Sequence, residues 1–237
     1  MIELKKCMTF GVNLKEHCKT FNVSLPIPLT ILVKYLTDDE LIKREGIFRL
    51  SATKTNLALI KEHLEKTGRI DFDACPLVVA TLIKQYIRKL SGFIETSLFD
   101  AFRKVAAKPS SEFNEAAKEL VDTLDENTKT LLIYLAHFIK YISLYYESNK
   151  MDLKNLSIVF GPTIFSCDDP SALDSQEILN YFIASFCEAI EEIYPNDNLF
   201  NEQSFNTYDE DRKDSIPEER SGLYVFEEII ENQEKDQ

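Results

Sequence analysis

The chain is poor in the residues that interrupt regular secondary structure. Its 237 residues include only six glycines and eight prolines, and there is no tryptophan. Because glycine and proline mark turns, their scarcity favours long helices over many short strands. Hydrophobic residues make up 44% of the chain, an ordinary globular value that allows one sizeable core. The length suits one domain, or one domain with an appendage.

The chain also has little that would hold a metal ion, form disulfides or enter a membrane. The three histidines form no HExxH pair, and the five cysteines are odd in number and lack CxxC spacing. No apolar run follows Lys5 and Lys6, and the longest apolar stretch, residues 131–139, is too short to span a bilayer. We therefore expect no metal or cofactor, reduced thiols, no direct membrane anchor and a cytoplasmic location.

Positive charge is scarce overall, with 27 Lys and Arg against 40 Asp and Glu and a formal net charge of -13. This balance argues against nucleic-acid binding, which needs a basic footprint. Residues 43–89 differ, because they hold ten basic residues and five acidic ones, a local charge of +5. This basic segment is either a set of solvated helix faces or a docking surface for an acidic partner.

The end of the chain is the most acidic part. Residues 196–237 contain thirteen acidic and four basic residues, so they carry -9 of the total charge. Such a composition is typical of a tail that is partly disordered, and residues 223–230 are compatible with one short docking helix. We expect a helical domain at 1–195 and an acidic tail at 196–237. From charge alone, we hypothesise that the tail folds back on the basic segment and inhibits docking.

Hydrophobic residues recur three and four positions apart, which predicts an all-α fold, a single-domain helical bundle. Helices are expected at about 28–43, after a cap at Ser51 or Thr53, from Pro76 onward, around 98–105 and 113–120, and at 128–146 and 178–193. The segment 128–146 has the strongest periodicity, so we interpret its aromatic stripe as core. The sequence has no Gly-rich phosphate loop, GxSxG elbow or convincing His/Cys pair, so an independent hydrolase is the weakest hypothesis.

Three segments, in order, resemble the motifs of the Rho GTPase-activating (RhoGAP) domain family. They are EGIFRLSA at 45–52, LIKQYIRKL at 82–90 and NKMDLKNLSIVFGPT at 149–163. The resemblance extends over roughly residues 10–194. It implies a helical bundle that binds a Rho-family small GTPase in the GTP-bound state and accelerates GTP hydrolysis. Such a domain completes the active site of its partner and is not itself an enzyme.

The resemblance also implies roles for individual residues. Arg49 matches the family's arginine finger, which is inserted into the partner's active site. Gly46 and Phe48 belong to the finger loop, where Gly46 permits a left-handed backbone and Phe48 can anchor the loop in the core. A fixed, permanently charged guanidinium suits the phosphate oxygens on which charge develops.

Four further residues match family positions that contact the GTPase or position the finger: Lys84, Arg88, Asn155 and Pro162. Lys84 and Arg88 are four apart and so share a helix face. Each has a structural alternative, namely a solvated stripe for the Lys–Arg pair, a helix cap or turn for Asn155 and a helix end at Pro162. The chain departs from the family at Ala52, where glycine is frequent, and at 90–94, where LSGFI replaces a Leu-Pro-Glu-Pro-Leu stretch.

Two functions are carried forward from these observations. The first is a GTPase activator with Arg49 as the finger. The alternative is a non-catalytic binding module of the same fold that acts as a GTPase effector or scaffold. The presence of Arg49 favours the activator, because a pure scaffold has no need of the finger.

Overall fold

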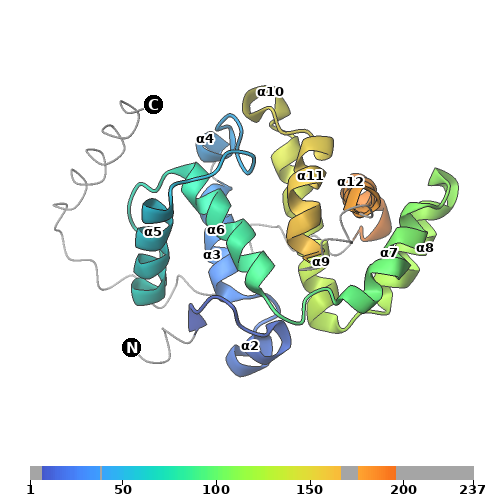
Figure 1. Ribbon diagram of the computed structural model, residues 1–237, viewed down its shortest axis with the longest axis horizontal. Coiled ribbons are helices and arrows are strands. Elements are labelled where there is room, and N and C mark those ends of the chain that lie inside the picture. Colours follow the sequence, from blue (N-terminus) through green and yellow to red (C-terminus); the bar gives the residue numbers. More distant parts are fainter. Residues whose placement is uncertain (1–6, 38, 167–175, 196–237) are drawn as a thin grey trace.

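The computed structural model describes residues 7–37, 39–166 and 176–195, and these residues form an all-α fold (Figure 1). The helices are α2 (Leu14–Phe21), α3 (Ile27–Leu36), α4 (Asp39–Ile42), α5 (Lys54–Thr67), α6 (Pro76–Lys89), η1 (Thr96–Leu98), α7 (Phe99–Ala106), α8 (Ser110–Asp122), α9 (Glu126–Ser143), α10 (Tyr146–Asn149), α11 (Leu153–Ile164) and α12 (Gln176–Ile193). Within the described residues there is no strand, only an isolated parallel bridge between Asn13 and Ser91. The predicted fold class is therefore confirmed. The acidic tail at 196–237, with its proposed docking helix, lies outside the described residues.

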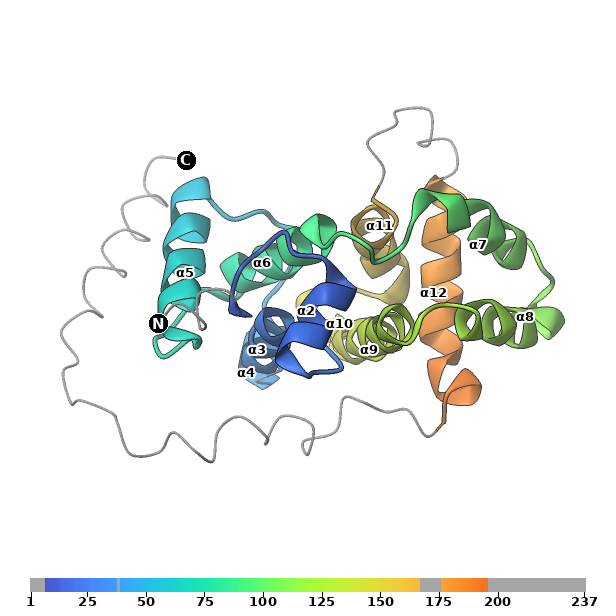
Figure 2. The ribbon, with the colours of Figure 1, turned by 90° about the horizontal axis from the view of Figure 1, so that it is seen from below.

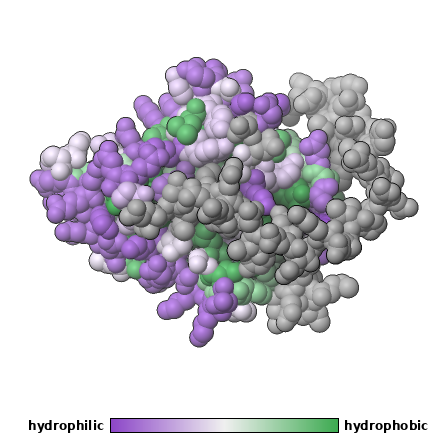
Figure 3. Space-filling model, turned by 180° about the vertical axis from the view of Figure 1, so that it is seen from behind, coloured by the Kyte–Doolittle hydropathy of each residue, from purple (hydrophilic) through white to green (hydrophobic). Residues whose placement is uncertain are grey.

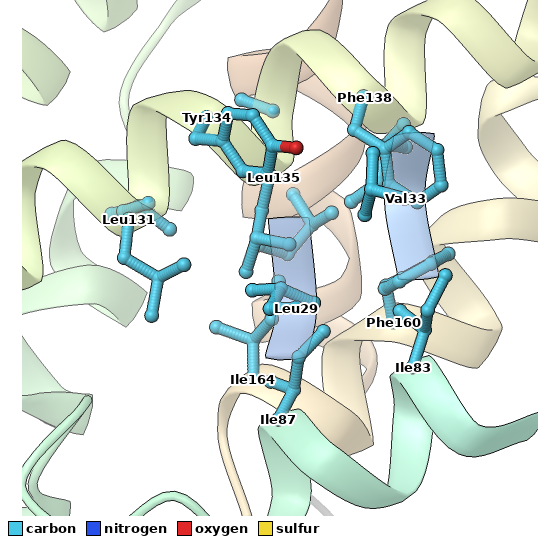
Figure 4. Packing of buried hydrophobic residues seen from close by; sticks show 14 of the residues in the cluster. Leu29, Val33, Ile83, Ile87, Leu131, Tyr134, Leu135, Phe138, Phe160 and Ile164 are labelled. Carbon is cyan, nitrogen blue, oxygen red and sulfur yellow. The ribbon is translucent and has the colours of Figure 1, made fainter. Parts of the chain in front are cut away.

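Helix α9 is the central element of the core. Its buried residues point in all directions around the helix, as expected for a helix enclosed by others. Figure 4 shows side chains of four helices directed toward one another: Leu29 and Val33 of α3, Ile83 and Ile87 of α6, Leu131, Tyr134, Leu135 and Phe138 of α9, and Phe160 and Ile164 of α11. The core helix predicted at 128–146 is thus confirmed, with its bounds shifted to 126–143.

Several helices begin where the sequence supplies a cap. Thr53 accepts a hydrogen bond from the Asn56 amide and starts α5, which selects it over Ser51 as the predicted cap. Asp125 and Asp152 do the same for α9 and α11. Such caps satisfy amides that have no partner within the helix, and each typically contributes about 1 kcal/mol.

The prediction of a single helix at 28–43 is wrong, because the segment forms two helices, α3 and α4. At the end of α3, the Thr37 amide donates to the carbonyls of both Val33 and Lys34, and the Thr37 hydroxyl also donates to Lys34. Tyr141 of α9 donates to the Thr37 carbonyl at 3.3 Å. These side-chain bonds compete with continuation of the helix, which periodicity alone does not reveal.

Helices α7, α8 and α12 pack together on one side of α9 and α11 (Figure 2). A cluster of phenylalanines joins them, with ring centroids 4.9 Å apart for Phe102 and Phe182 and 5.0 Å apart for Phe102 and Phe165. The edge-to-face geometry of these pairs is the one that aromatic quadrupoles favour. The buried helix predicted at 178–193 is confirmed as α12, which begins at Gln176.

On the face shown in Figure 3, hydrophilic residues cover most of the described surface that is visible, and hydrophobic residues show only in smaller areas. Among the described residues, no helix is both long and apolar enough to cross a membrane.

Gly161 lets α11 approach α12 closely. A Cβ atom at this position would lie 1.8 Å from the Asn180 Oδ1 atom and 3.1 Å from the Gln176 Nε2 atom. The same two side chains are hydrogen-bonded, since the Gln176 Nε2 group donates to the Asn180 oxygen at 3.0 Å. The glycine therefore allows the present packing of these side chains between the two helices, and it is not needed for a turn.

We expect Gly161→Ala to destabilise the domain by about 1–3 kcal/mol through overpacking, partly offset by the higher helix propensity of alanine. Urea unfolding of the wild type and the variant measures this difference. The control is the double variant Gly161→Ala with Asn180→Ala, which removes the atom that clashes and should recover most of the lost stability. Equal stabilities for the two variants would contradict the proposed contact.

Candidate functional site

The loop at residues 43–53, between α4 and α5, contains the predicted finger. It folds into two successive turns, because the Ile47 amide donates to the Arg44 carbonyl at 3.1 Å and the Arg49 amide donates to the Gly46 carbonyl at 2.9 Å. Gly46 and Phe48, the third residues of these turns, have φ angles of 71° and 66°. Two left-handed residues on either side of Ile47 turn the chain sharply before Arg49.

Phe48 adopts a backbone conformation that is rare for a bulky residue and costs about 1–3 kcal/mol. Its ring is fully buried, with centroids 5.0 Å from Phe160 of α11 and 5.8 Å from Phe138 of α9. The ring therefore supplies the burial free energy that offsets the strain. The expectation that Phe48 anchors the loop in the core is confirmed by this packing.

Arg49 follows the anchored ring and is exposed. Among the described residues its guanidinium has no hydrogen-bond or ion-pair partner, whereas Ile47 and Phe48 beside it have no exposed surface. The chain therefore passes from two buried side chains to two exposed ones, Arg49 and Leu50, at this point of the loop. The result is a charged fork directed away from the core on a loop that is fixed from within.

Lys84 of α6 holds the loop from a second direction. Its Nζ group donates a hydrogen bond to the Phe48 carbonyl. Burial lowers the pKa of the Lys84 ammonium from its ordinary value, and the positive charge of Arg88 lowers it further. Arg88 lies one turn further along α6 and is exposed. The structure thus brings Lys84 directly against the finger loop and leaves Arg88 beside it facing solvent.

The end of α10 contacts the same loop through Asn149. This residue is not among the predicted site residues, yet its carbonyl accepts the Gly46 amide at 2.9 Å. The only hint of this role in the sequence is that asparagine is frequent in turns. The structure does have a turn here, because the next residue, Lys150, is left-handed with a φ of 58°. Helices α4 and α10 accordingly lie at the same end of the molecule, at the top of Figure 1.

Asn155 lies in the first turn of α11 and is exposed. Its amide is capped by Asp152 at 2.7 Å, and its side chain donates to the Lys150 carbonyl at 3.4 Å. The asparagine therefore takes part in the start of the helix but does not cap it, since that cap is Asp152. Its exposed side chain is connected, through the Lys150 turn, to the residue that holds Gly46.

The prediction that α11 ends at Pro162 is wrong. The helix continues to Ile164, and Phe165 is its C-cap. The fixed φ of proline is compatible with a helix, and the amide that it lacks would have served Ile158, which is 52% exposed. At the C-cap, the Phe165 amide donates to the Gly161 carbonyl at 2.8 Å. Pro162 itself is half-buried on the helix.

The turn after α6, where the sequence departs from the family pattern, is closed by the N-terminal segment. Ser91 donates its amide to the Val12 carbonyl at 3.1 Å and accepts the Leu14 amide at 3.0 Å. Gly92 has a φ of 70°, and a Cβ atom there would lie 2.8 Å from the Asn13 Nδ2 atom. A bridge between distant segments thus forms the turn that follows the helix bearing Arg88.

The basic segment divides into two classes of cation. Four of its ten Lys and Arg residues form ion pairs: Lys43, Lys61, Lys66 and Arg69. The other six have no ion pair with any described residue: Arg44, Arg49, Lys54, Lys84, Arg88 and Lys89. The solvated-face interpretation therefore fits α5, while the unpaired cations belong to the finger loop, the first residue of α5, and α6.

Three of the five thiols are poorly suited to act as nucleophiles. Cys7, Cys18 and Cys187 are free and buried, and burial raises the pKa of each, to about 11 for Cys18. A thiol with a raised pKa is inert at neutral pH. In the part of the chain that the structure describes, no cluster of His, Cys, Asp or Glu could hold a metal ion. What the site offers is a presented arginine with supporting cations and amides.

Comparisons with known proteins identify the family of the chain. A family model described as the RhoGAP domain matches residues 26–169. The match covers more than half of the chain, which therefore belongs to the RhoGAP domain family, as the sequence motifs predicted.

Individual relatives resemble the chain over most of its length. Probable Rho-type GTPase-activating protein 2 of Schizosaccharomyces pombe is 31% identical over 193 residues, which are 75% of this chain and 15% of that protein. Rho GTPase-activating protein gacA of Dictyostelium discoideum is 29% identical over 175 residues, 71% of this chain and 49% of that protein. The chain thus spans about half or less of the length of these relatives.

A solved structure shares the fold. The crystal structure of human Rho GTPase activating protein 15 superposes with a TM-score of 0.69, at 21% sequence identity. The superposition covers 78% of this chain and 91% of that one.

We expect Gly46→Ala to destabilise the domain by about 1–2 kcal/mol, because alanine is strained in the left-handed region. Its Cβ atom would also lie 2.8 Å from the Leu50 Cγ atom. The matched control is Gly11→Ala, where φ is 79° and no atom lies within 4 Å of the added Cβ atom. Urea unfolding should show a larger loss for Gly46→Ala. A smaller loss than for Gly11→Ala would contradict the packing described for the loop.

Proposed function

We propose that this chain binds a Rho-family GTPase in its GTP-bound state and accelerates GTP hydrolysis by placing Arg49 in the partner's active site. The observation that carries the proposal is the exposed Arg49 guanidinium, which has no partner among the described residues and follows a strained, buried anchor. Membership of the RhoGAP domain family and the names of the relatives support the same activity.

The chemistry of phosphoryl transfer explains why an arginine serves. Charge develops on the oxygens of the transferring phosphoryl group, and a guanidinium offers rigid donors with bidentate geometry. An arginine finger supplied by a second protein typically accelerates hydrolysis about 10³–10⁵-fold, equivalent to roughly 4–7 kcal/mol. Because the loop backbone is already fixed before binding, the conformational entropy lost on docking is mainly that of the Arg49 side chain.

The remaining predicted residues take supporting roles in the proposal. Lys84 positions the finger loop by its bond to the Phe48 carbonyl, and Arg88 contacts the partner from the same helix. Asn155 offers an exposed amide that can donate to and accept from the partner's backbone. Pro162 contributes an apolar contact from α11.

The alternative is a non-catalytic module of the same fold that binds a GTPase as an effector or scaffold. Such a module needs the exposed cations but not the strain at Phe48. The backbone cost at Phe48 and the bond from Lys84 both act on the residue next to Arg49, which favours the activator.

Arg49→Ala should reduce the stimulated rate of GTP hydrolysis about 10³–10⁵-fold while binding persists. Arg49→Lys should be a poor substitute, because an ammonium keeps the charge but lacks the planar fork. The measurement is single-turnover hydrolysis by a panel of Rho-family GTPases at saturating domain. Binding is titrated separately with GTPases loaded with a non-hydrolysable GTP analogue.

Arg44→Ala is the control for this experiment, because Arg44 is an exposed arginine of the same loop without an ion pair. It should keep the stimulated rate at saturation. Undiminished stimulation by Arg49→Ala would remove Arg49 from the proposed role. Binding by the wild type without any stimulation, across the panel, would favour the scaffold.

The unpaired cations should steer association with an acidic partner surface. The association rate constant is therefore expected to fall as NaCl rises, and Arg88→Ala should make that dependence shallower. Lys66→Ala removes the same charge from a residue already paired with Glu62 at 2.6 Å, so it should change the dependence less. Stopped-flow binding at several salt concentrations tests this, and equal slopes for both variants would contradict a localised docking surface.

A further inference from the structure

Asn149, the last residue of α10, is a fully buried amide, with 0% of its surface exposed. Buried polar side chains need complete hydrogen bonding, because an unsatisfied group costs about 1–3 kcal/mol. The amide nitrogen of Asn149 donates to the Ile42 carbonyl at 3.2 Å and to the Ile142 carbonyl at 3.0 Å. Its side-chain oxygen accepts the Met151 amide at 2.8 Å. Both donor hydrogens are therefore used.

These bonds connect four parts of the fold at one residue. Ile42 is the last residue of α4, immediately before the finger loop, and Ile142 belongs to the central helix α9. Met151 is buried in the turn that leads to α11. The Asn149 backbone carbonyl also accepts the Gly46 amide, within the loop itself. Asn149 thus holds the finger loop at Gly46, in its first turn, while Lys84 holds the loop at Phe48, in its second turn.

The geometry suits asparagine in particular. Glutamine has the same amide but one methylene more, and the site has no exposed space to receive it. Aspartate keeps the acceptor for Met151 but has no hydrogen to give to the two carbonyls. Serine has one donor and is shorter. The two N–H donors of the asparagine side chain bond to the Ile42 and Ile142 carbonyls and so fix the position of the Asn149 backbone. The backbone carbonyl of Asn149, which binds the Gly46 amide, is fixed with it.

We propose that Asn149 is a positioning residue for Arg49, acting through the Gly46 amide and the end of α4. This inference rests on the proposed function, since it concerns the placement of the finger during hydrolysis. Without the Asn149 side chain, the loop loses its fixed starting point and Arg49 samples orientations that do not reach the phosphoryl oxygens. Docking depends on the cations of α6 and the exposed face of α11, which the substitution leaves in place.

The test compares Asn149→Ala and the milder Asn149→Ser with the wild type. At saturating domain, the single-turnover rate should fall about tenfold to a hundredfold, the loss typical of a small misplacement of a reacting group. The dissociation constant for a GTPase loaded with a non-hydrolysable GTP analogue should change little. Because binding titration counts the folded molecules, a loss of folded protein is separated from a loss of rate.

The matched control is Thr128→Val. Thr128 is also buried, with 1% exposed, and its hydroxyl donates to the Phe93 carbonyl and the Asp125 carboxylate, at the other end of the core. This variant should lose stability and keep the rate per folded molecule. The same Asn149 substitutions are also made with Arg49→Ala. If Asn149 acts through Arg49, they should cause no further loss of rate there.

The outcomes separate the two proposals. If the wild type stimulates no GTPase, the proposed function fails. If the wild type stimulates and Arg49→Ala does not, but the Asn149 variants match the wild type, only the positioning role fails. Equal losses in the presence and absence of Arg49 would also overturn it. Should neither variant fold, hydrogen exchange of the wild type decides, since the role requires a protected Gly46 amide and rapid exchange there would contradict it.

Discussion

The burial of the Phe48 ring is the interaction on which the site depends. The ring contacts Phe138 and Phe160, and the backbone of Phe48 is in the left-handed region. The side chain that follows this buried ring is the exposed Arg49. Gly46, Lys84 and Asn149 then act on the same short loop, through backbone conformation, a carbonyl and an amide. The candidate site is therefore held in place by the hydrophobic core, because the residue before Arg49 is itself part of that core.

The sequence predicts the fold well where periodicity and caps determine it. The repeats of 128–146 and 178–193 indicate α9 and α12, and Thr53 begins α5 as a capping residue should. The sequence does not predict the fold where side chains from distant segments determine the end of a helix. At the end of α3, the Tyr141 hydroxyl donates to the Thr37 carbonyl from a distant helix, and α11 continues past Pro162 to Ile164.

The candidate site is predicted in the same uneven way. Motifs identify Arg49, Lys84, Arg88 and Asn155, and glycine marks one left-handed turn of the loop at Gly46. The second left-handed residue, Phe48, has no signal in the sequence, since aromatic residues rarely adopt that conformation. The importance of Asn149 is equally hidden, because burial and partners more than 100 positions away define it, as the bond to Ile42, 107 residues distant, illustrates. Local patterns cannot report contacts of that kind.

The isolated bridge between Asn13 and Ser91 shows that part of the fold depends on distant segments of the chain. Helices form from contacts close in the chain, whereas the hydrogen bonds at this bridge include bonds between Val12 and Ser91, which are 79 positions apart. Closing such loops costs chain entropy before any contact rewards it. Two bonds of the finger loop are also long-range, namely the bond from the Gly46 amide to the Asn149 carbonyl and the bond from Lys84 to the Phe48 carbonyl. The helical turns therefore depend on contacts close in the chain, whereas the placement of Arg49 depends on contacts between distant segments.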